Sequence, residues 1–382
     1  ANPYYINKVK YLKSKGFFEN LEPDFNRLDE STVISNITHT RQIVFEVTDS
    51  CNLNCTYCAL GNLYKGYDER INKKIDPHVS LNLLKYIFNL KPATKDKLMF
   101  ISFYGGEALL NMNFIKQIVK AANELNVEKG FSIQYSMTTN GTLLHKHIDF
   151  LVDNKFRLLI SLDGNEKNHS YRVFTKDKKN SFHRVIENID MIQKDYPEYF
   201  NNCVNFNAVL HDRNSVKDIN EFIFTRYHKI PRISELNIRD VKSEKKEFLD
   251  SLFRNKLKSE TDYQEVASDL SHRTHESLSS YRELIEFLNY LSVNYYISNI
   301  NALLHTEEKY LPTNTCTPFS KKIFLTNRNK LLPCEKINYE YSLGQIDDKI
   351  EIDVSGITRQ YNYYYEHIKK FCQFCYSYHF CG

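Results

Sequence analysis

Three cysteines on one short loop constrain this chain more than any other feature of its sequence. Cys51, Cys55 and Cys58 are spaced C-x3-C-x2-C, directly after Gln42–Thr48, whose β-branched and aromatic residues predict a buried strand. A structural zinc ion usually takes four ligands from two separate pairs, whereas a [4Fe–4S] cluster is normally bound by four cysteines. Three thiolates on one loop therefore favour such a cluster, with one iron left open for a substrate or cofactor.

Strand-like and helix-like segments alternate after the cysteine loop. Further strands are predicted at 97–104, 131–137, 157–162, 204–210 and 235–241. Amphipathic helices are predicted between them, at 78–90, 113–125, 145–154, 183–194 and 216–227. Repeated β-α units indicate a parallel sheet. We therefore predict an α/β fold, a partial (β/α)6 TIM-like barrel with its chemistry at the carboxyl edge of the strands.

The composition narrows the class of protein further. A chain of 382 residues is long enough for two or three domains. Its net charge of +4 is small for 51 basic and 47 acidic residues, so it gives no indication of nucleic-acid binding. We find neither a hydrophobic run of membrane-spanning length nor an N-terminal signal segment. We therefore expect a cytoplasmic protein, away from membranes, with reduced cysteines.

Polar residues follow the predicted strands at the edge where the cysteine loop begins. Gly105-Gly106-Glu107 follows the second strand, Asn140 the third and Ser161 the fourth. Glycines allow the backbone to approach a ligand closely, and a carboxylate is a partner for an ammonium group. By itself this glycine-rich triplet is equally typical of a tight turn.

The cysteine loop and these flanking segments resemble the radical SAM superfamily. The signature of that family is C-x3-C-x-aromatic-C after the first strand of a partial barrel, and Tyr57 is the aromatic residue here. The resemblance, over roughly residues 40–382, implies that the open iron binds the amino and carboxylate groups of S-adenosylmethionine. One electron from the cluster then splits this cofactor to methionine and a 5′-deoxyadenosyl radical, which abstracts a substrate hydrogen atom.

The resemblance also implies roles at the barrel mouth. Gly105-Gly106-Glu107 would bind the methionyl amino group, and Ser161 would hydrogen-bond the cofactor carboxylate. Arg172 would pair with the same carboxylate, or else form a surface ion pair. No catalytic base is assigned, because Asp163, Asp240 and Glu335 are each more typical of structural carboxylates. The predicted cofactor-binding residues are Tyr57, Gly105, Gly106, Glu107, Asn140, Ser161, Arg172 and Asn207.

A second group of cysteines lies near the C-terminus, spaced C-x17-C and C-x2-C-x5-C. The segment 323–334 reads as a β-hairpin that leads into the second of them, with Asn329 at a turn position that favours a left-handed backbone. This region resembles the SPASM domain, which binds auxiliary [4Fe–4S] clusters. The resemblance assigns the first pair to an inner cluster and the other three to an outer cluster. The predicted ligands are Cys316, Cys334, Cys372, Cys375 and Cys381.

One departure from the SPASM pattern, and a second reading of the same cysteines, leave alternatives open here. The SPASM pattern continues with further cysteines, whereas this sequence stops at Gly382. We therefore expect either a chain cut short of its natural C-terminus or incomplete auxiliary sites, with one or two clusters. The last four of these cysteines also satisfy the ligand count of a single zinc site.

The sequence predicts four regions. Residues 1–40 form an N-terminal extension with a helix at 4–15, and residues 41–242 form the barrel. Residues 243–310 form a helical bridge with an amphipathic helix at 276–291, and residues 311–382 form the SPASM-type domain.

These resemblances predict an oxidoreductase that modifies a ribosomally made precursor peptide. A hydrogen atom is abstracted and a thioether, carbon–carbon or similar crosslink closes. Flavodoxin or ferredoxin is the expected electron donor. The alternatives are an anaerobic sulfatase-maturase-like enzyme that forms formylglycine, an inactive relative that only binds a peptide, and a zinc-stabilised scaffold. Neither the substrate nor the bond formed is predicted, and the oligomeric state stays open.

Overall fold

The structure is a computed structural model that describes residues 3–15, 26–65, 70–94, 97–267, 317–347 and 349–372. The chain divides into two compact units. One, here called the barrel unit, comprises residues 37–269 and 321–352. The other, here called the terminal unit, comprises residues 1–36, 270–320 and 353–382. Each unit is described by itself.

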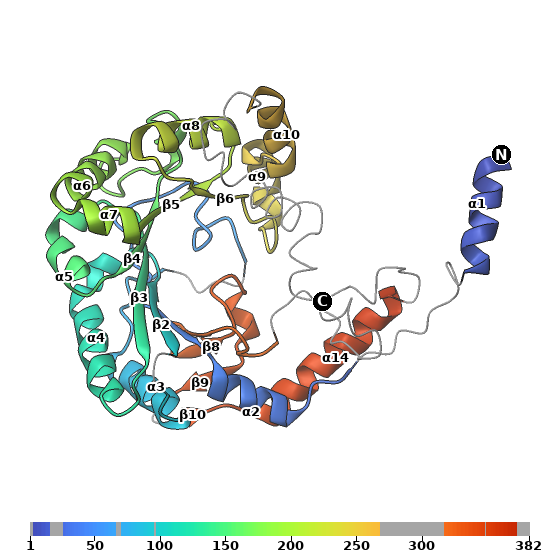
Figure 1. The fold of residues 1–382 in the computed structure, drawn as a ribbon, viewed down its shortest axis with the longest axis horizontal. Coiled ribbons are helices and arrows are strands. Elements are labelled where there is room, and N and C mark those ends of the chain that lie inside the picture. Colours follow the sequence, from blue (N-terminus) through green and yellow to red (C-terminus); the bar gives the residue numbers. More distant parts are fainter. Residues whose placement is uncertain are drawn as a thin grey trace. The chain divides into compact units, whose positions relative to one another are not determined.

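The barrel unit is built on six neighbouring parallel strands. Each of the strands β1 to β5 pairs in parallel with the next one along the chain. Figure 1 shows helices α3 to α8 along the outer side of this curved sheet. The predicted partial (β/α)6 barrel is confirmed. The strands are β1 (Gln42–Glu46), β2 (Leu98–Tyr104), β3 (Ser132–Thr139), β4 (Arg157–Ser161), β5 (Val204–Val209) and β6 (Arg232–Ser234).

The helices begin where the sequence supplies capping groups. The Asp76 side chain accepts a hydrogen bond from the backbone N–H of His78, and Pro77 occupies the first turn of α3. Buried apolar residues at helical spacing turn one face of each helix toward the sheet. The outer helices are α3 (Pro77–Leu90), α4 (Met112–Asn126), α5 (Ile148–Asp153), α6 (Phe182–Asp195), α7 (Pro197–Cys203) and α8 (Val216–Tyr227).

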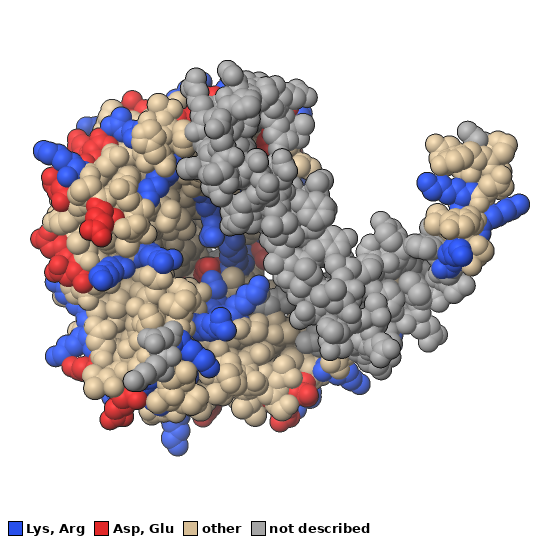
Figure 2. All heavy atoms as spheres, viewed as in Figure 1, with Lys and Arg blue, Asp and Glu red and all other residues tan. Residues whose placement is uncertain are grey.

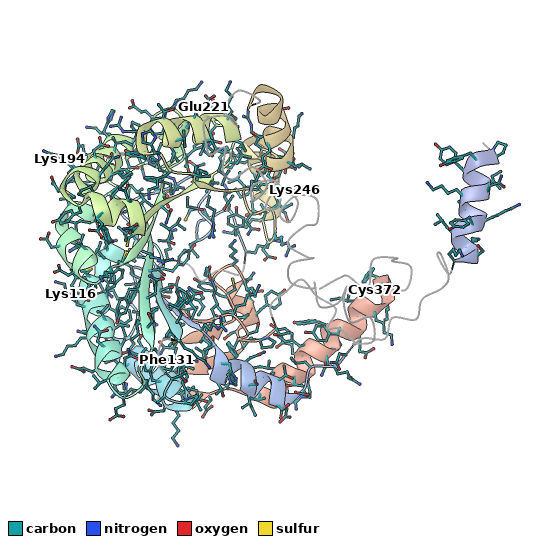
Figure 3. All side chains as sticks on the ribbon, viewed as in Figure 1. Lys116, Phe131, Lys194, Glu221, Lys246 and Cys372 are labelled. Carbon is teal, nitrogen blue, oxygen red and sulfur yellow. The ribbon has the colours of Figure 1, made fainter. Side chains whose placement is uncertain are left out.

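Aromatic side chains form the core between the sheet and these helices. Phe45 of β1 stacks on Phe103 of β2 at 6.2 Å between ring centroids, and it meets Phe114 of α4 edge-on. Phe103 also stacks on Phe156. In contrast, Lys116 of α4 projects from the outer surface in Figure 3. Figure 2 shows basic and acidic side chains interspersed over the described part of this outer face, as expected for a nearly neutral chain.

Two predicted elements differ from the structure, and some of its helices were not predicted. The sixth strand was expected at 235–241 but lies at 232–234, because β5 pairs Asn207 with Arg232 immediately after α8 ends. Residues 235–241 contribute only an isolated bridge from Val241 to Tyr64. The helix expected at 145–154 is divided into a 3-10 turn, Leu144–Lys146, and α5. Helices α7 and α2 (Glu30–His39) were not predicted.

The predicted hairpin in the C-terminal region is confirmed, and it extends the barrel sheet. Strand β7 (Ile323–Leu325) pairs in parallel with β1 and antiparallel with β8 (Lys330–Leu332). Strands β9 (Gly344–Ile346) and β10 (Ile350–Glu351) continue the sheet. Asn329 in the turn has a left-handed φ of 63°. The region boundaries predicted from the sequence stay a prediction, and the compact units divide the chain at other positions.

Helices in the N-terminal extension and in the bridge agree with the predicted helical regions, whereas α14 (Val354–Cys372) was not predicted. Helix α1 (Pro3–Ser14) confirms the helix expected at 4–15. The 3-10 turn Ser243–Lys245, α9 (Lys246–Leu252) and α10 (Lys256–Ala267) occupy the start of the predicted bridge. The helix expected at 276–291 lies outside the described residues. In the terminal unit, the side chain of Asn362 on α14 (Val354–Cys372) bonds both backbone groups of Leu28.

Over the part of the chain that the structure describes, no helix is both long enough and apolar enough to cross a membrane.

Candidate functional site

The three cysteines of the loop lie together after β1. The Cys51 sulfur accepts hydrogen bonds from the Leu53 backbone N–H at 3.4 Å and from Asn140 Nδ2 at 3.8 Å. The Cys58 sulfur accepts one from Arg70 Nη2 at 2.7 Å. The loop is held by a turn in which Cys58 N donates to the Cys55 carbonyl at 3.2 Å. N–H groups therefore already point at two of the three sulfur atoms.

Burial keeps the Cys51 and Cys55 thiols protonated when no metal is bound. Burial raises the pKa of Cys51 to about 11, and the nearby Glu107 carboxylate adds to that rise. Burial raises the pKa of Cys55 to about 12, while Arg172 opposes the rise and the other two cysteines add to it. The three groups are thus close enough to influence one another's ionisation. Metal binding here releases protons, because thiolates are the ligands.

The donor set fits a cluster better than a single ion. Among the residues described, no three His, Cys, Asp or Glu side chains are arranged to hold one metal ion. A [4Fe–4S] cluster does not need that arrangement, because each thiolate binds a different iron. Arg70 Nε is also buried without a hydrogen-bond partner in the described chain, which leaves a donor for an anionic group.

Gly105 and Gly106 lie directly against the start of the cysteine loop. Gly106 N donates to the Thr48 carbonyl at 2.8 Å, and Glu107 N donates to the Ser50 carbonyl at 2.9 Å. A Cβ atom on Gly105 would lie 2.3 Å from Thr48 O, and one on Gly106 would lie 2.1 Å from Ser50 O. Gly105 also has a φ of 135°. Both glycines are therefore required for this close backbone packing.

The Glu107 carboxylate joins the ends of β2 and β3. Its Oε1 accepts from Leu109 N at 3.1 Å and from Thr139 Oγ1 at 2.7 Å, and its Oε2 accepts from Asn140 N at 2.7 Å. The side chain is 1% exposed. Burial raises the pKa of Glu107 above its ordinary value, although these hydrogen bonds oppose the rise. These hydrogen-bond partners are neutral groups of the protein, and the predicted role of Glu107 toward the methionyl amino group stays a prediction.

Asp163 and Arg172 form a buried ion pair on the other side of the loop. Arg172 Nε and Nη2 lie 2.8 and 2.9 Å from the two Asp163 oxygens. Asp163 also accepts from Val209 N at 2.9 Å and from the Tyr57 hydroxyl. Burial alone would raise the pKa of Asp163, but Arg172 and the hydrogen bonds hold it below its ordinary value. The surface ion pair considered for Arg172 is wrong, because this pair is buried.

Tyr57 belongs to a cluster of rings that supports the cysteine loop. Its ring stacks on His211 at 5.4 Å and meets Tyr171 edge-on at 6.1 Å. The Arg172 guanidinium lies 5.4 Å from the Tyr57 ring centroid. Cys55 packs against the same cluster. Tyr57 thus links the loop to Asp163 and to the rings behind it.

The other predicted cofactor residues lie at the same sheet edge. Asn140 follows β3, and its Nδ2 bonds Asn52 Oδ1 at 2.9 Å. Ser161 is the last residue of β4 and pairs in register with Asn207 of β5. The structure brings Asn140 to Cys51, and it places Ser161 beside Asn207. Their roles toward a cofactor stay a prediction.

The C-terminal cysteines are described only in part. Cys334 follows β8, and the thiol contacts Glu335 Oε2 at 3.6 Å, while Lys322 pairs with that carboxylate at 2.9 Å. Cys372 is buried on α14. Cys316, Cys375 and Cys381 lie outside the described residues. The predicted auxiliary ligands and the single-zinc alternative therefore stay untested.

Two residues at the site were not predicted. Arg70 lies twelve positions after Cys58 on a segment with no recognisable motif, and only the fold brings it to the sulfur. His211 is fully buried with one nitrogen 3.9 Å from Asp163. Its position directly after β5 was the one available signal, because residues at strand ends line this edge.

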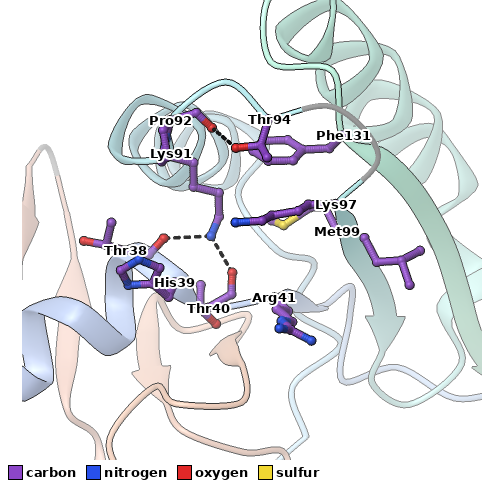
Figure 4. A pocket seen from close by; sticks show the side chains of 11 residues that line it. Thr38, His39, Thr40, Arg41, Lys91, Pro92, Thr94, Lys97, Met99 and Phe131 are labelled. Atoms are coloured by element: carbon purple, nitrogen blue, oxygen red, sulfur yellow. Dashed lines mark hydrogen bonds between the residues drawn. The ribbon is translucent and has the colours of Figure 1, made fainter.

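A cavity at the opposite end of the sheet does not belong to this site. It has a volume of about 320 Å³ and lies by Thr40, Arg41 and Lys97 near the start of β1 and β2. Figure 4 shows Lys91 beside it, donating to the carbonyls of Thr38 and Thr40. Burial lowers the pKa of Lys91 to about 8, and Lys97 adds to that effect. Lys91 therefore fixes the segment that leads into β1.

Comparisons with known proteins identify the class. Residues 45–224 match the family profile described as the radical SAM superfamily. Residues 45–224 therefore carry a radical SAM domain. That family uses S-adenosylmethionine and a [4Fe–4S] cluster.

Two curated proteins are similar in sequence to part of this chain. Over 177 residues the chain is 27% identical to the radical SAM cyclopropyl synthase TigE of Paramaledivibacter caminithermalis, which covers 44% of this chain and 35% of the relative. Over 161 residues it is 29% identical to a cysteine-type anaerobic sulfatase-maturating enzyme of Clostridium novyi, which covers 41% of each chain. These matches span about two-fifths of the relatives, so they are similarities of the radical SAM region.

Solved structures support the fold. The structure of anSMEcpe with bound AdoMet and Kp18Cys peptide matches with a TM-score of 0.59 at 17% sequence identity, over 89% of this chain and 87% of that one. Streptococcus suis SuiB matches with a TM-score of 0.50 at 14% identity, over 92% of this chain and 74% of that one. At these identities the likeness concerns the fold alone.

Proposed function

We propose that this radical SAM protein modifies a ribosomally made precursor peptide by hydrogen abstraction, followed by closure of a thioether, carbon–carbon or similar crosslink. The observation that supports the proposal most is the contact between the cysteine loop and Gly105–Glu107 at the carboxyl edge of β1 and β2. The relatives add support, because they include a cyclopropyl synthase and sulfatase-maturating enzymes, and one similar structure holds a peptide.

Cys51, Cys55 and Cys58 would hold the [4Fe–4S] cluster, and S-adenosylmethionine would complete its coordination. Bound together, these two groups supply the radical that abstracts a hydrogen atom. Gly105 and Gly106 bring the backbone close to this position. Ser161 and Asn207 would bind the cofactor from the neighbouring strands.

Glu107 and Arg172 would act mainly by positioning. The Glu107 oxygens fix the backbone of Asn140 and the η1 turn, Ala108–Asn111, beside the cysteine loop. Arg172 holds Asp163, which holds the Tyr57 hydroxyl. The barrel thereby orients the loop before any cofactor binds, and such preorganisation lowers the cost of reaching reactive geometry.

Closure of a crosslink needs an acceptor for one electron after the hydrogen atom has left. We propose auxiliary clusters for this role, bound by Cys316 with Cys334 and by Cys372, Cys375 and Cys381. A flavodoxin or ferredoxin would supply the electron that starts the reaction. Iron and sulfide counts test this part, because about four irons per chain indicate one cluster and about eight or twelve indicate auxiliary clusters.

The activity is tested by anaerobic incubation of the reconstituted protein with dithionite, S-adenosylmethionine and the peptide encoded beside its gene. We expect 5′-deoxyadenosine and a peptide lighter by two hydrogens per crosslink. The matched control is the protein with Cys51, Cys55 and Cys58 changed to Ala. Cofactor cleavage without a change in any neighbouring peptide would contradict the peptide assignment.

Formylglycine formation is the second candidate, favoured by the sulfatase-maturating relatives. A short peptide with the pattern C-x-P-x-R separates the two. An oxidised cysteine side chain would lose sulfur and two hydrogens and gain oxygen, whereas a serine would lose two hydrogens. Failure of the reduced protein to cleave S-adenosylmethionine would instead favour a peptide-binding protein without this activity.

A further inference from the structure

Arg70 places a positive charge on one side of the cysteine loop. Its Nη2 donates to the Cys58 sulfur at 2.7 Å, which is short for a hydrogen bond to sulfur. The hydrogen bonds to Cys51 come from neutral groups, the Leu53 backbone and the Asn140 amide. The three thiolates of a bound cluster would therefore lie in unequal surroundings.

The position of Arg70 is fixed by backbone contacts to the strand that leads into the loop. Ile71 N donates to Asp49 Oδ2 at 3.0 Å, and Asp49 N donates to the Lys73 carbonyl at 3.2 Å. Ile75 N donates to the Val47 carbonyl at 3.1 Å. The segment after Arg70 therefore runs beside residues 47–49 and carries the guanidinium to the sulfur.

Among the residues that the structure describes, Arg70 has no carboxylate partner. Within the described residues, no ion pair joins Arg70 to an Asp or Glu, and its buried Nε has no hydrogen-bond partner. An arginine stays charged in proteins under ordinary conditions. Arg172, the other arginine near the loop, is instead paired with Asp163 at 2.8 Å. The positive charge of Arg70 is therefore directed at the sulfur ligands.

A positive charge at a ligand sulfur changes the energy of cluster reduction. Reduction of a [4Fe–4S]2+ cluster to [4Fe–4S]+ adds one electron, which dithionite or a small redox protein supplies. The reduced form carries one more negative charge, so a nearby guanidinium stabilises it more than the oxidised form. Hydrogen bonds to the sulfur atoms act in the same direction.

We propose that Arg70 raises the reduction potential of the cluster on Cys51, Cys55 and Cys58 through its contact with the Cys58 sulfur. Arg70 is then a residue that tunes electron entry and does not itself touch the substrate. This inference rests on the proposed function, because it requires the cluster to bind at this loop.

The test is an anaerobic redox titration of the full chain, followed by electron paramagnetic resonance. The relevant signal is the one that changes when S-adenosylmethionine is added and that is missing when Cys51, Cys55 and Cys58 are changed to Ala. Arg70→Gln should lower the midpoint so that the ratio of reduced to oxidised cluster falls at least tenfold at a given potential, or about 59 mV for one electron. Arg157→Gln, on the exposed start of β4, is the matched control and should not shift the midpoint.

An unchanged midpoint in Arg70→Gln with its full iron content would overturn the inference. If Arg70→Gln does not retain the cluster, a second neutral variant, Arg70→Met, decides, because it removes both the charge and the contact with the Cys58 sulfur. A lowered midpoint in Arg70→Met supports the inference and an unchanged one overturns it. A changed affinity for S-adenosylmethionine at unchanged midpoint also overturns it. Absence of the responsive signal in the unmodified protein defeats the proposed function itself, and the inference with it.

Discussion

Two buried carboxylates lie at the same edge of the sheet and have opposite partners. Glu107, after β2, accepts hydrogen bonds from two backbone N–H groups and one hydroxyl. Asp163, after β4, is paired with the Arg172 guanidinium. Burial raises the pKa of Glu107, whereas burial of Asp163 is outweighed by Arg172 together with hydrogen bonds, which lower the pKa of Asp163. Similar burial therefore gives different electrostatics, because one partner is charged and the other partners are neutral.

The two carboxylates and their partners also affect the pKa values of the cysteines differently. Glu107 adds to the raised pKa of Cys51, while Arg172 opposes the raised pKa of Cys55. One carboxylate thus leaves a negative charge facing the loop, and the other is neutralised by its own arginine. The cysteine loop is thus held both by Glu107, which accepts hydrogen bonds from neutral donors, and by the ion pair of Asp163 with Arg172.

Breaking the ion pair should have the largest effect on stability. Arg172→Met leaves Asp163 buried without its cation, which typically costs about 3–5 kcal/mol. The measurement is urea unfolding of the apoprotein under reducing conditions. Arg226→Met is the matched control, because Arg226 pairs with Asp190 at a half-exposed surface site worth about 0–1 kcal/mol. Equal losses in both variants would show that Asp163 does not depend on Arg172.

Weakening the hydrogen bonds to Glu107 should have a smaller effect on stability. Glu107→Gln replaces one accepting oxygen by an NH2 group that cannot accept from Asn140 N or from its other donors. We expect a loss of about 1–3 kcal/mol in the free energy of unfolding, the cost of an unsatisfied buried donor. We also expect the pKa of Cys51 to fall, measured by the pH dependence of its alkylation. Glu166→Gln, at an exposed site, is the control, and an unshifted Cys51 would contradict the electrostatic link.

The stability of the protein should also depend on pH through His169. Its ring accepts a hydrogen bond from the backbone N–H of Asp163, the residue that pairs with Arg172. Burial lowers the pKa of His169 to about 3, below an ordinary value of 6.5. Between these values the unfolded chain binds a proton that the folded chain does not, so stability falls as pH falls. From pH 7 to pH 5 this group should cost roughly 2 kcal/mol.

The role of His169 is tested by measuring the unfolding of His169→Gln at pH 7 and at pH 5. This variant should lose roughly 2 kcal/mol less stability between the two pH values than the unmodified chain. His183→Gln, at an exposed site beside Glu166, should leave the pH dependence unchanged. The same pH dependence in His169→Gln and in the unmodified chain would place the titrating group elsewhere.

The smallest expected loss of stability comes from removing the hydrogen bond between Tyr57 on the cysteine loop and Asp163. Tyr57→Phe removes the hydroxyl that donates to Asp163, while the Arg172 contacts stay in place. We expect a loss of about 1 kcal/mol, typical of one buried hydrogen bond. Tyr196→Phe, whose hydroxyl donates to Asp149 at an exposed site, should change the stability less. Losses of the same size would mean that Tyr57 contributes through its ring alone.

The barrel strands were predictable because their residues carry local signals. Buried β-branched and aromatic runs predicted β1 to β5 within a few residues, and apolar periodicity predicted α3, α4, α6 and α8. The sixth strand was misplaced because β6 has three residues and is positioned by pairing with β5, which is not a local signal. The pairing of β7 with β1 was likewise not predictable, since those strands are far apart in sequence.

The candidate site likewise has features that the sequence predicted and features that only the tertiary contacts decide. The spacing of Cys51, Cys55 and Cys58 and the adjacent glycines indicated a shared edge, because parallel strands end together. No local pattern indicated that Glu107 accepts hydrogen bonds from Thr139 and Asn140, or that Arg172 pairs with Asp163. Such partners depend on which side chains meet across neighbouring strands.

By itself the sequence determined the cysteine spacing, the alternation of strands and helices, and the glycines that permit close packing. These properties follow from covalent order and local backbone preference. Only the tertiary structure decided the electrostatics of the loop: Arg70 at the Cys58 sulfur, Glu107 beside Cys51, and Arg172 neutralised by Asp163. The physical reason is that charge–charge energies depend on distance and burial, and both are set by contacts between residues distant in the chain.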